Sequence, residues 1–203
     1  DKADKPVHLL AALLAFVPPM LALAAIPFGE GMAALDLQLG VVYVIAVTTL
    51  ASLPVLLAGY ASNNKYSLVG GMRVVNQAIS YEVPQAFAIL SVIMVAGTFN
   101  LTEIVHFQQQ HLWLVCVQPL AFVIYIISAV AECNRAPFDL PEGESELTAG
   151  VFTEYSGMRY ALFYLAEYCN MFVAAGLATT LFLGGFSGPF LPGWLWFILK
   201  TFV

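Results

Sequence analysis

Residues 8–27 read HLLAALLAFVPPMLALAAIP, a stretch whose single ionisable side chain is its first. A helix of about 20 apolar residues crosses the hydrocarbon core of a bilayer, and this stretch is long enough to do so. Similar stretches recur along the chain, so we predict five full spans and the start of a sixth near Pro192. The other four predicted spans are residues 39–61, 79–98, 112–131 and 160–183.

The composition agrees with a membrane protein. Of the 203 residues, 61% are hydrophobic and only 10% are charged, which is too little polar surface to cover a soluble domain. We therefore expect an all-α, polytopic transmembrane helix bundle that forms one domain over residues 1–203. Because the last apolar segment stops at Val203 before reaching spanning length, we also expect the chain to be part of a longer protein.

Prolines lie inside several predicted spans, where they remove backbone hydrogen-bond donors. In lipid, the carbonyl groups that they free need protein or water as partners. Ordinary kinked packing and a polar cavity lined by the spans are both compatible with this pattern. The prolines concerned are Pro18, Pro19, Pro54, Pro84 and Pro119.

Basic residues fall almost entirely on one side of the predicted bundle. By the positive-inside rule this side is the cytoplasmic face of a bacterial inner membrane, or the matrix face of a mitochondrial one, and we prefer the bacterial membrane. The opposite side carries acids and two histidines but no Lys or Arg, and the sequence leaves Lys200 unplaced. The basic residues are Lys2, Lys5, Lys65, Arg73, Arg135 and Arg159.

A charged loop over residues 132–159 joins two apolar stretches. With Ala131 it reads AECNRAPFDLPEGESELTAGVFTEYSGMR and holds six carboxylates and two arginines. A solvated loop is the plain interpretation. Interspersed apolar residues such as Phe138 instead suggest packing, and like charges this close together raise one another's pKa values. We therefore expect a functional loop on the cytoplasmic side.

Three acids lie within or at the edge of predicted spans. Glu167 is about eight residues into its helix, where an ionised side chain costs at least about 2.5–3.5 kcal/mol unless it is hydrated or paired. Glu82 begins the third span and Glu132 ends the fourth. The set suits stepwise proton transfer through water. The alternatives are a neutral, locally satisfied Glu167 and an ion pair of Glu82 with Arg73 or Lys65.

Motifs for other chemistry do not occur in the sequence. The three cysteines and three histidines lack the spacing of iron–sulfur, haem or zinc sites, and no glycine-rich phosphate loop occurs. Seven Lys and Arg residues form no basic stripe, which argues against nucleic acid as a partner. Any redox step is then expected in another subunit, and this chain would supply a channel, a binding wall or a coupling element.

Five segments together resemble a known family, the quinone-chamber membrane subunit of respiratory complex I, which is called NuoH in bacteria and NADH dehydrogenase subunit 1 in mitochondria. The resemblance covers nearly the whole chain, in the order and at the spacing of that family. The segments are ADKP (3–6), SNNKYSLVGGMR (62–73), QAISYEV (77–83), AECNRAPFDLPEGESEL (131–147) and TEYSGMRYALFYLAEY (153–168).

The resemblance implies a membrane subunit of a proton-translocating NADH:quinone oxidoreductase. It implies quinone, either ubiquinone or menaquinone, as the substrate at the subunit interface, and no FMN, haem or iron–sulfur cluster bound by this chain. Implied partners are membrane lipid, the adjacent small membrane subunits, and the peripheral-arm subunits that bear the terminal iron–sulfur cluster and the quinone headgroup site.

The resemblance also implies roles for individual residues. It assigns Glu82, Glu132, Glu154 and Glu167 to a proton path and Asp4 to the entrance of the quinone cavity. It assigns a quinone-chamber loop to Arg135, Phe138, Asp139, Glu142, Glu144 and Glu146. Cys133 departs from the usual Thr or Ala of the family, but this change removes no ionisable group.

Two rival functions stay open at this point. The homologous membrane subunit of a proton-pumping hydrogenase or formate hydrogenlyase would share much of this pattern, although the residues within the motifs favour the quinone enzyme. An ion antiporter or transport subunit could also place acids within helices. Antiporter-like subunits generally use lysines in the middle of helices, and the five predicted full spans contain none.

Overall fold

A computed structural model describes residues 4–138, 151 and 155–202. Every regular element in the described part of the chain is a helix, which confirms the predicted all-α class. The helices are α1 (Lys5–Ala25), α2 (Gly40–Thr49), α3 (Ser52–Ala61), α4 (Lys65–Ala96), α5 (Leu101–Gln110), α6 (Leu114–Val117), α7 (Pro119–Glu132), α9 (Met158–Phe182) and α10 (Gly193–Phe202).

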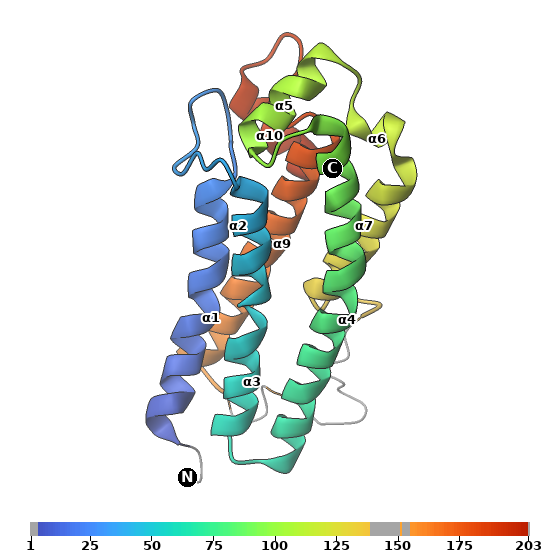
Figure 1. The fold of residues 1–203 in the computed structure, drawn as a ribbon. Helices are drawn as coiled ribbons and strands as arrows, with labels where there is room; N and C mark the ends of the chain where they lie inside the picture. Colours follow the sequence, from blue (N-terminus) through green and yellow to red (C-terminus); the bar gives the residue numbers. More distant parts are fainter. Residues whose placement is uncertain (1–3, 139–150, 152–154, 203) are drawn as a thin grey trace.

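The long helices run side by side in one elongated bundle (Figure 1). The N-terminus and the turn between α3 and α4 lie at one end, and α5, α10 and the segment between α1 and α2 lie at the other. Among the described residues, four helical segments are long and apolar enough to cross a membrane: Pro6–Ala25, Gly40–Ala61, Lys65–Ala96 and Met158–Phe182.

The predicted span over residues 112–131 was wrong as a single helix. The chain instead forms α6, leaves helical geometry at Gln118 (φ −133°, ψ 63°), and starts α7 at Pro119. Pro119 has no N–H to continue a helix, but it fits the first position of a new one. The Gln118 side chain bonds Ser91 of α4 in both directions, at 3.0 and 3.1 Å, and holds this break against the bundle.

The third span is longer than the sequence predicted. It begins at Lys65 rather than near residue 79, so Lys65 and Arg73 lie within α4 and not in a connection. The Asn64 side chain caps the helix by accepting the Tyr66 N–H at 3.1 Å, and Gly97 ends it in the left-handed conformation at φ 71°.

The span over residues 40–61 bends in its middle, between α2 and α3. The hydroxyls of Thr48 and Thr49 donate to the Ile45 carbonyl at 3.1 and 3.0 Å. Bonds of this kind, from a side chain back to the preceding turn, bend helices. Pro54 adds to the effect because it offers no N–H to the carbonyl of Leu50, four residues before it.

Small residues bring α3 and α4 close together. A Cβ atom on Gly59 would lie 2.8 Å from the Ser67 carbonyl oxygen, and Gly71 lies opposite it on α4. The main core lies nearer the other end of the bundle, where large side chains such as Ile89, Tyr125 and Phe182 are fully buried. Near the α3–α4 turn, the second core cluster is built mostly from alanines and leaves more room.

Two polar side chains close the end of α9. Gln108 of α5 donates to the Thr180 carbonyl at 2.9 Å and accepts the Gly184 N–H at 3.0 Å. Lys200 of α10 donates to the Leu183 and Ser187 carbonyls, each at 2.7 Å. Lys200, which the sequence left unplaced, therefore caps a helix at the end of the bundle away from the N-terminus.

Candidate functional site

A cavity of about 240 Å³ lies inside the bundle and brings together the three acids of the predicted spans. Glu82 comes from α4, Glu132 is the last residue of α7, and Glu167 comes from α9. Much of the remaining wall consists of small side chains, which explains why the space is not filled. The small wall residues are Ala15, Ala51, Ser52, Ala78, Ala136 and Ala166.

Glu132 occupies the deepest polar position in this group. Gln85, one turn after Glu82 on α4, donates its amide N–H to Glu132 Oε2 at 2.8 Å. The Thr48 hydroxyl lies within hydrogen-bonding reach of the same carboxyl group. Beyond Glu132 a smaller space of about 30 Å³ continues toward the ring of Tyr125. Glu132 thus stands where the cavity meets the packed core.

Glu82 faces the bend between α2 and α3. Its carboxyl group lies within hydrogen-bonding reach of the Thr49 hydroxyl, and it lines both the large and the small space. Glu82 and Glu132 are close enough for their charges to influence each other. The two acids therefore share one environment, although they are fifty positions apart in sequence.

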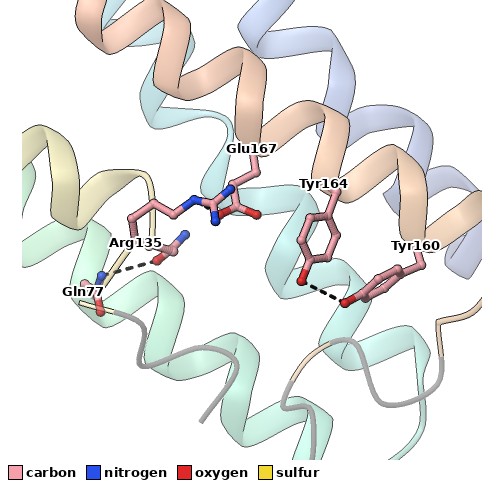
Figure 2. A network of polar contacts seen from close by, with 6 residues as sticks. Gln77, Arg135, Tyr160, Tyr164 and Glu167 are labelled. Atoms are coloured by element: carbon pink, nitrogen blue, oxygen red, sulfur yellow. Dashed lines mark hydrogen bonds and ion pairs between the residues drawn. The ribbon is translucent and has the colours of Figure 1, made fainter. Parts of the chain in front are cut away.

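Arg135, just after α7, forms an ion pair with Glu167, with Nε and Oε1 3.0 Å apart (Figure 2). The guanidinium group also lies over the ring of Tyr168, 4.8 Å from its centre. Hydrogen bonding to Tyr168 and the charge of Glu167 raise the pKa of Arg135 above its ordinary value. Glu167 is consequently a paired acid, not an isolated charge in an apolar helix.

Two tyrosines extend this polar face along α9. Tyr160, Tyr164 and Glu167 occupy successive turns of one helix face, and the Tyr160 hydroxyl donates to the Tyr164 hydroxyl at 2.9 Å (Figure 2). Tyr164 lines the cavity, whereas Tyr160 is exposed. A line of hydroxyl groups therefore leads from the surface toward the ion pair.

Gln77 of α4 fixes the end of α7. Its amide donates to the carbonyls of Ala131 at 2.7 Å and Phe138 at 2.9 Å. Phe138 packs edge-on against Tyr81, with ring centres 5.1 Å apart. The predicted chamber residue Phe138 therefore sits beside the cavity wall, held to α4 through both its backbone and its ring.

Asp4 does not join this cavity. It is exposed ahead of α1, and its backbone N–H donates to the Ala61 carbonyl at 3.0 Å. Nearby, His8 stacks on Tyr155 with ring centres 3.7 Å apart, and Arg159 donates to His8 Nδ1 at 3.1 Å. Burial raises the pKa of Tyr155 to about 12. This cluster ties the start of α1 to the segment before α9.

The remaining predicted site residues lie outside the described part of the chain. They are Asp139, Glu142, Glu144, Glu146 and Glu154. Their assignment to the chamber loop and the proton path stays a prediction.

Sequence reasoning missed three partners of the acids: Thr48, Thr49 and Gln85. A signal for each was present in the sequence. The two threonines stand in the middle of an apolar span, a few residues before Pro54, and Gln85 follows Glu82 by three residues and so shares its helix face. Polar side chains within a span face the bundle interior more often than lipid, and this rule holds for the two threonines and for Gln85.

Chemically, the arrangement is suited to holding and passing protons. A polar space of about 240 Å³ exceeds by far the 10–15 Å³ or so that one water molecule needs. Three carboxyl groups, a cationic side chain and several hydroxyls line or adjoin it. In the described part of the chain, no group of three or more His, Cys, Asp or Glu side chains is placed to bind a metal ion.

Comparisons with known proteins relate the whole chain to one family. The family described as NADH dehydrogenase matches residues 1–203. An NADH-quinone oxidoreductase subunit of Carboxydothermus hydrogenoformans is 50% identical over 206 residues, which cover 100% of this chain and 59% of that protein. The corresponding NADH-quinone oxidoreductase subunits of Dehalococcoides mccartyi and Bacillus thuringiensis are each 49% identical, over 98% of this chain and 56% and 60% of their own lengths. The chain thus spans less than two thirds of these relatives.

Proposed function

This chain belongs to the NADH dehydrogenase family, and from that premise we propose that it is a membrane subunit of a proton-translocating NADH:quinone oxidoreductase. In this proposal the chain forms part of the chamber through which quinone reaches its reduction site. It couples quinone reduction to proton transfer and carries no electrons itself. It works in the bacterial inner membrane, with membrane lipid, the adjacent small membrane subunits and the peripheral-arm subunits as partners.

The observation that carries the proposal is the shared cavity of Glu82, Glu132 and Glu167. Three acids from three helices converge on one polar space inside an otherwise apolar bundle. Burying carboxyl groups in this way is costly unless they are hydrated, paired or protonated. Such an arrangement supports a relay, because each site can hold a proton and pass it on through water.

Arg135 gives the cavity a connection to the predicted loop over residues 132–159. It sits at the start of that loop and is paired with Glu167 of the cavity. A charge that appears beside the loop when quinone is reduced would compete for Arg135 or repel Glu167. We propose that this competition shifts the protonation of the three acids, so the coupling is electrostatic and conformational.

The hydrogenase-type subunit is the second candidate, and it would use the same acids with hydrogen chemistry in place of quinone chemistry. The names of the compared relatives favour the quinone enzyme. Purification of the complete assembly decides between them, since bound quinone supports the proposal and nickel without quinone supports the rival.

Replacing Glu167 tests the relay. Glu167→Gln keeps the shape of the side chain but can neither ionise nor pair with Arg135 as a charge. We expect proton pumping and NADH:quinone activity of the complete enzyme to fall at least tenfold, which corresponds to an increase of about 1.4 kcal/mol or more in the rate-limiting barrier. NADH oxidation with an artificial acceptor should stay at the wild-type rate.

The matched control is Glu103→Gln. Glu103 is an exposed acid in the first turn of α5, at the end of the bundle where α5 and α10 gather. The Glu103→Gln substitution should leave proton pumping and NADH:quinone activity unchanged. Coupled rates at the wild-type level in Glu167→Gln would show that the cavity acids are not a relay.

A further inference from the structure

Gln85 contacts a cavity carboxyl group directly through its side-chain amide. The side chain is 9% exposed, and its Nε2 lies 2.8 Å from Glu132 Oε2. Because Glu82 and Gln85 are three residues apart on α4, they present an acid and an amide on the same helix face. The spacing places both of them against Glu132.

Behind Gln85, away from the large cavity, lies the buried side chain of Tyr125. The Tyr125 hydroxyl is within hydrogen-bonding reach of Gln85, and it donates to the Ala174 carbonyl at 2.9 Å. Tyr125 is fully buried, and the space there is only about 30 Å³. An amide and a backbone carbonyl cannot pass on a proton in the way that a carboxyl group and water can. The large cavity of about 240 Å³ is therefore the roomier route to Glu132 for water and protons.

We propose that Gln85 is a positioning residue for Glu132, whose amide holds one carboxylate oxygen toward α4 so that the other oxygen serves the cavity shared with Glu82 and Glu167. This inference rests on the proposed function and deepens it. It names the side chain that orients the deepest acid and stabilises its ionised form, since an N–H donor favours a carboxylate over a carboxylic acid.

Other titratable groups also surround Glu132 and would contribute to any pH dependence. They are Glu82 from α4, Tyr164 and Glu167 from α9, and Tyr125, Cys133 and Arg135 from α7 and the residues after it. The portions of α1 and α3 that line the large cavity contribute no titratable side chain. A change at Gln85 removes a hydrogen bond without altering any of these charges, so its effect can be separated from theirs.

The fold supplies a matched control in Gln118. Like Gln85, Gln118 joins α4 to α7, but its amide exchanges hydrogen bonds with Ser91, and within the described part of the chain it bonds no acid. Both glutamines therefore hold the same two helices together. A purely structural role would make their replacement equivalent, whereas a positioning role confines the effect on proton chemistry to Gln85.

The test uses Gln85→Met and Gln118→Met in the complete enzyme, since the Met side chain is close to that of Gln in length and volume but has no N–H group. We expect Gln85→Met to move the pH profile of coupled NADH:quinone turnover about one unit toward higher pH, the size expected for a lost hydrogen bond to a charged group. Gln118→Met should leave the profile in place. NADH oxidation with an artificial acceptor reports assembly in both variants.

An unmoved profile in Gln85→Met, or equal shifts in the two variants, would overturn the positioning role. If Gln85→Met does not assemble, Gln85→Asn replaces it, because this variant keeps the amide but is one methylene too short, and it should give the same shift. Glu132→Gln separates the two proposals. Wild-type coupled turnover in Glu132→Gln refutes the relay itself, whereas a loss there with no shift at Gln85 refutes only the positioning.

Discussion

Tyr155 stacks on His8, and because its phenol group is buried, it makes the stability of the fold depend on pH. The two rings are nearly parallel, at 10°, and the Tyr155 hydroxyl donates to the His8 backbone carbonyl at 3.3 Å. Only 6% of Tyr155 is exposed. Burial favours the neutral phenol over the phenolate, so Tyr155 keeps its proton to higher pH in the folded protein than in the unfolded chain.

We predict a corresponding loss of stability at alkaline pH. The pKa of Tyr155 rises from 10.0 to about 12 on folding, so between these values the unfolded chain has lost a proton that the folded protein keeps. Stability therefore falls as the pH rises through this window, and the full contribution is present below pH 10. Thermal unfolding of the purified protein should show this fall, and Tyr155→Phe should make it shallower. Identical slopes in the two proteins would contradict the assignment.

At the residue scale, the sequence identified the acids of the site but not their partners. Glu82, Glu132 and Glu167 stand out because a carboxyl group is rare in an apolar span. The pairing of Glu167 with Arg135 depends on how the end of α7 meets α9, which no local pattern encodes. The same holds for Gln85, whose contact with Glu132 joins positions 47 apart in the chain.

At the scale of helices, the contact between α3 and α4 depends on two glycines in different ways. A Cβ at Gly59 would lie 2.8 Å from the Ser67 carbonyl oxygen, which is closer than real Cβ atoms approach. A Cβ at Gly71 would lie 3.5 Å from the nearest atom, an ordinary contact distance. The same substitution should therefore have opposite consequences at the two positions.

Gly59→Ala should lower the free energy of unfolding by about 1–3 kcal/mol, because α3 and α4 must move apart. Gly71→Ala should be neutral or slightly stabilising, because alanine favours helix over glycine by up to about 1 kcal/mol. Thermal unfolding and yield of the membrane-inserted protein measure both. Equal effects of the two changes would show that the helices do not approach this closely.

Helix boundaries were predictable where the apolar run and the helix coincide. The first and fifth predicted spans match α1 and α9 to within a few residues. The third failed at its start because a polar, glycine-containing segment continues as helix when it packs against α3. The fourth failed at Gln118 and Pro119, where hydropathy stays high but the backbone loses its helical donors.

At the scale of the whole molecule, the two ends of the bundle differ in charge. Lys65 begins α4 at the end that holds the N-terminus and the α3–α4 turn, and Arg159, near the start of α9, contacts His8 of α1 there, whereas Arg135 lines the cavity inside the bundle. Glu30 and Asp36 belong to the segment between α1 and α2, Glu103 to α5 and Lys200 to α10, and these elements lie at the other end. The cytoplasmic orientation of the basic end, inferred from the positive-inside rule, stays a prediction.

Cysteine labelling tests that orientation. Ser156 is exposed at the basic end, and Gln109 is exposed on α5 at the other. With the exposed native Cys116 replaced, a membrane-impermeant maleimide should label Ser156→Cys only in inside-out vesicles and Gln109→Cys only in intact spheroplasts. The reverse pattern would invert the bundle and move the cavity acids to the opposite side of the membrane.

Over the whole molecule, the sequence predicted the class of the fold and the choice of acids, and the family resemblance predicted membership. The three-dimensional convergence of the acids could not be read from hydropathy. It depends on the alanine-rich second core cluster, which leaves space at one level of the bundle, and on large side chains that fill the next level.

The bend in the helix over residues 40–61 links the backbone of that helix to the acids of the cavity. Each threonine hydroxyl there has a single hydrogen, and in this structure both hydrogens go to the Ile45 carbonyl. To donate to an ionised neighbour instead, Thr48 or Thr49 must let go of that carbonyl, which then loses one of the bonds that keep the helix curved. A change in the protonation of Glu82 or Glu132 would thus change the curvature of a membrane-crossing helix.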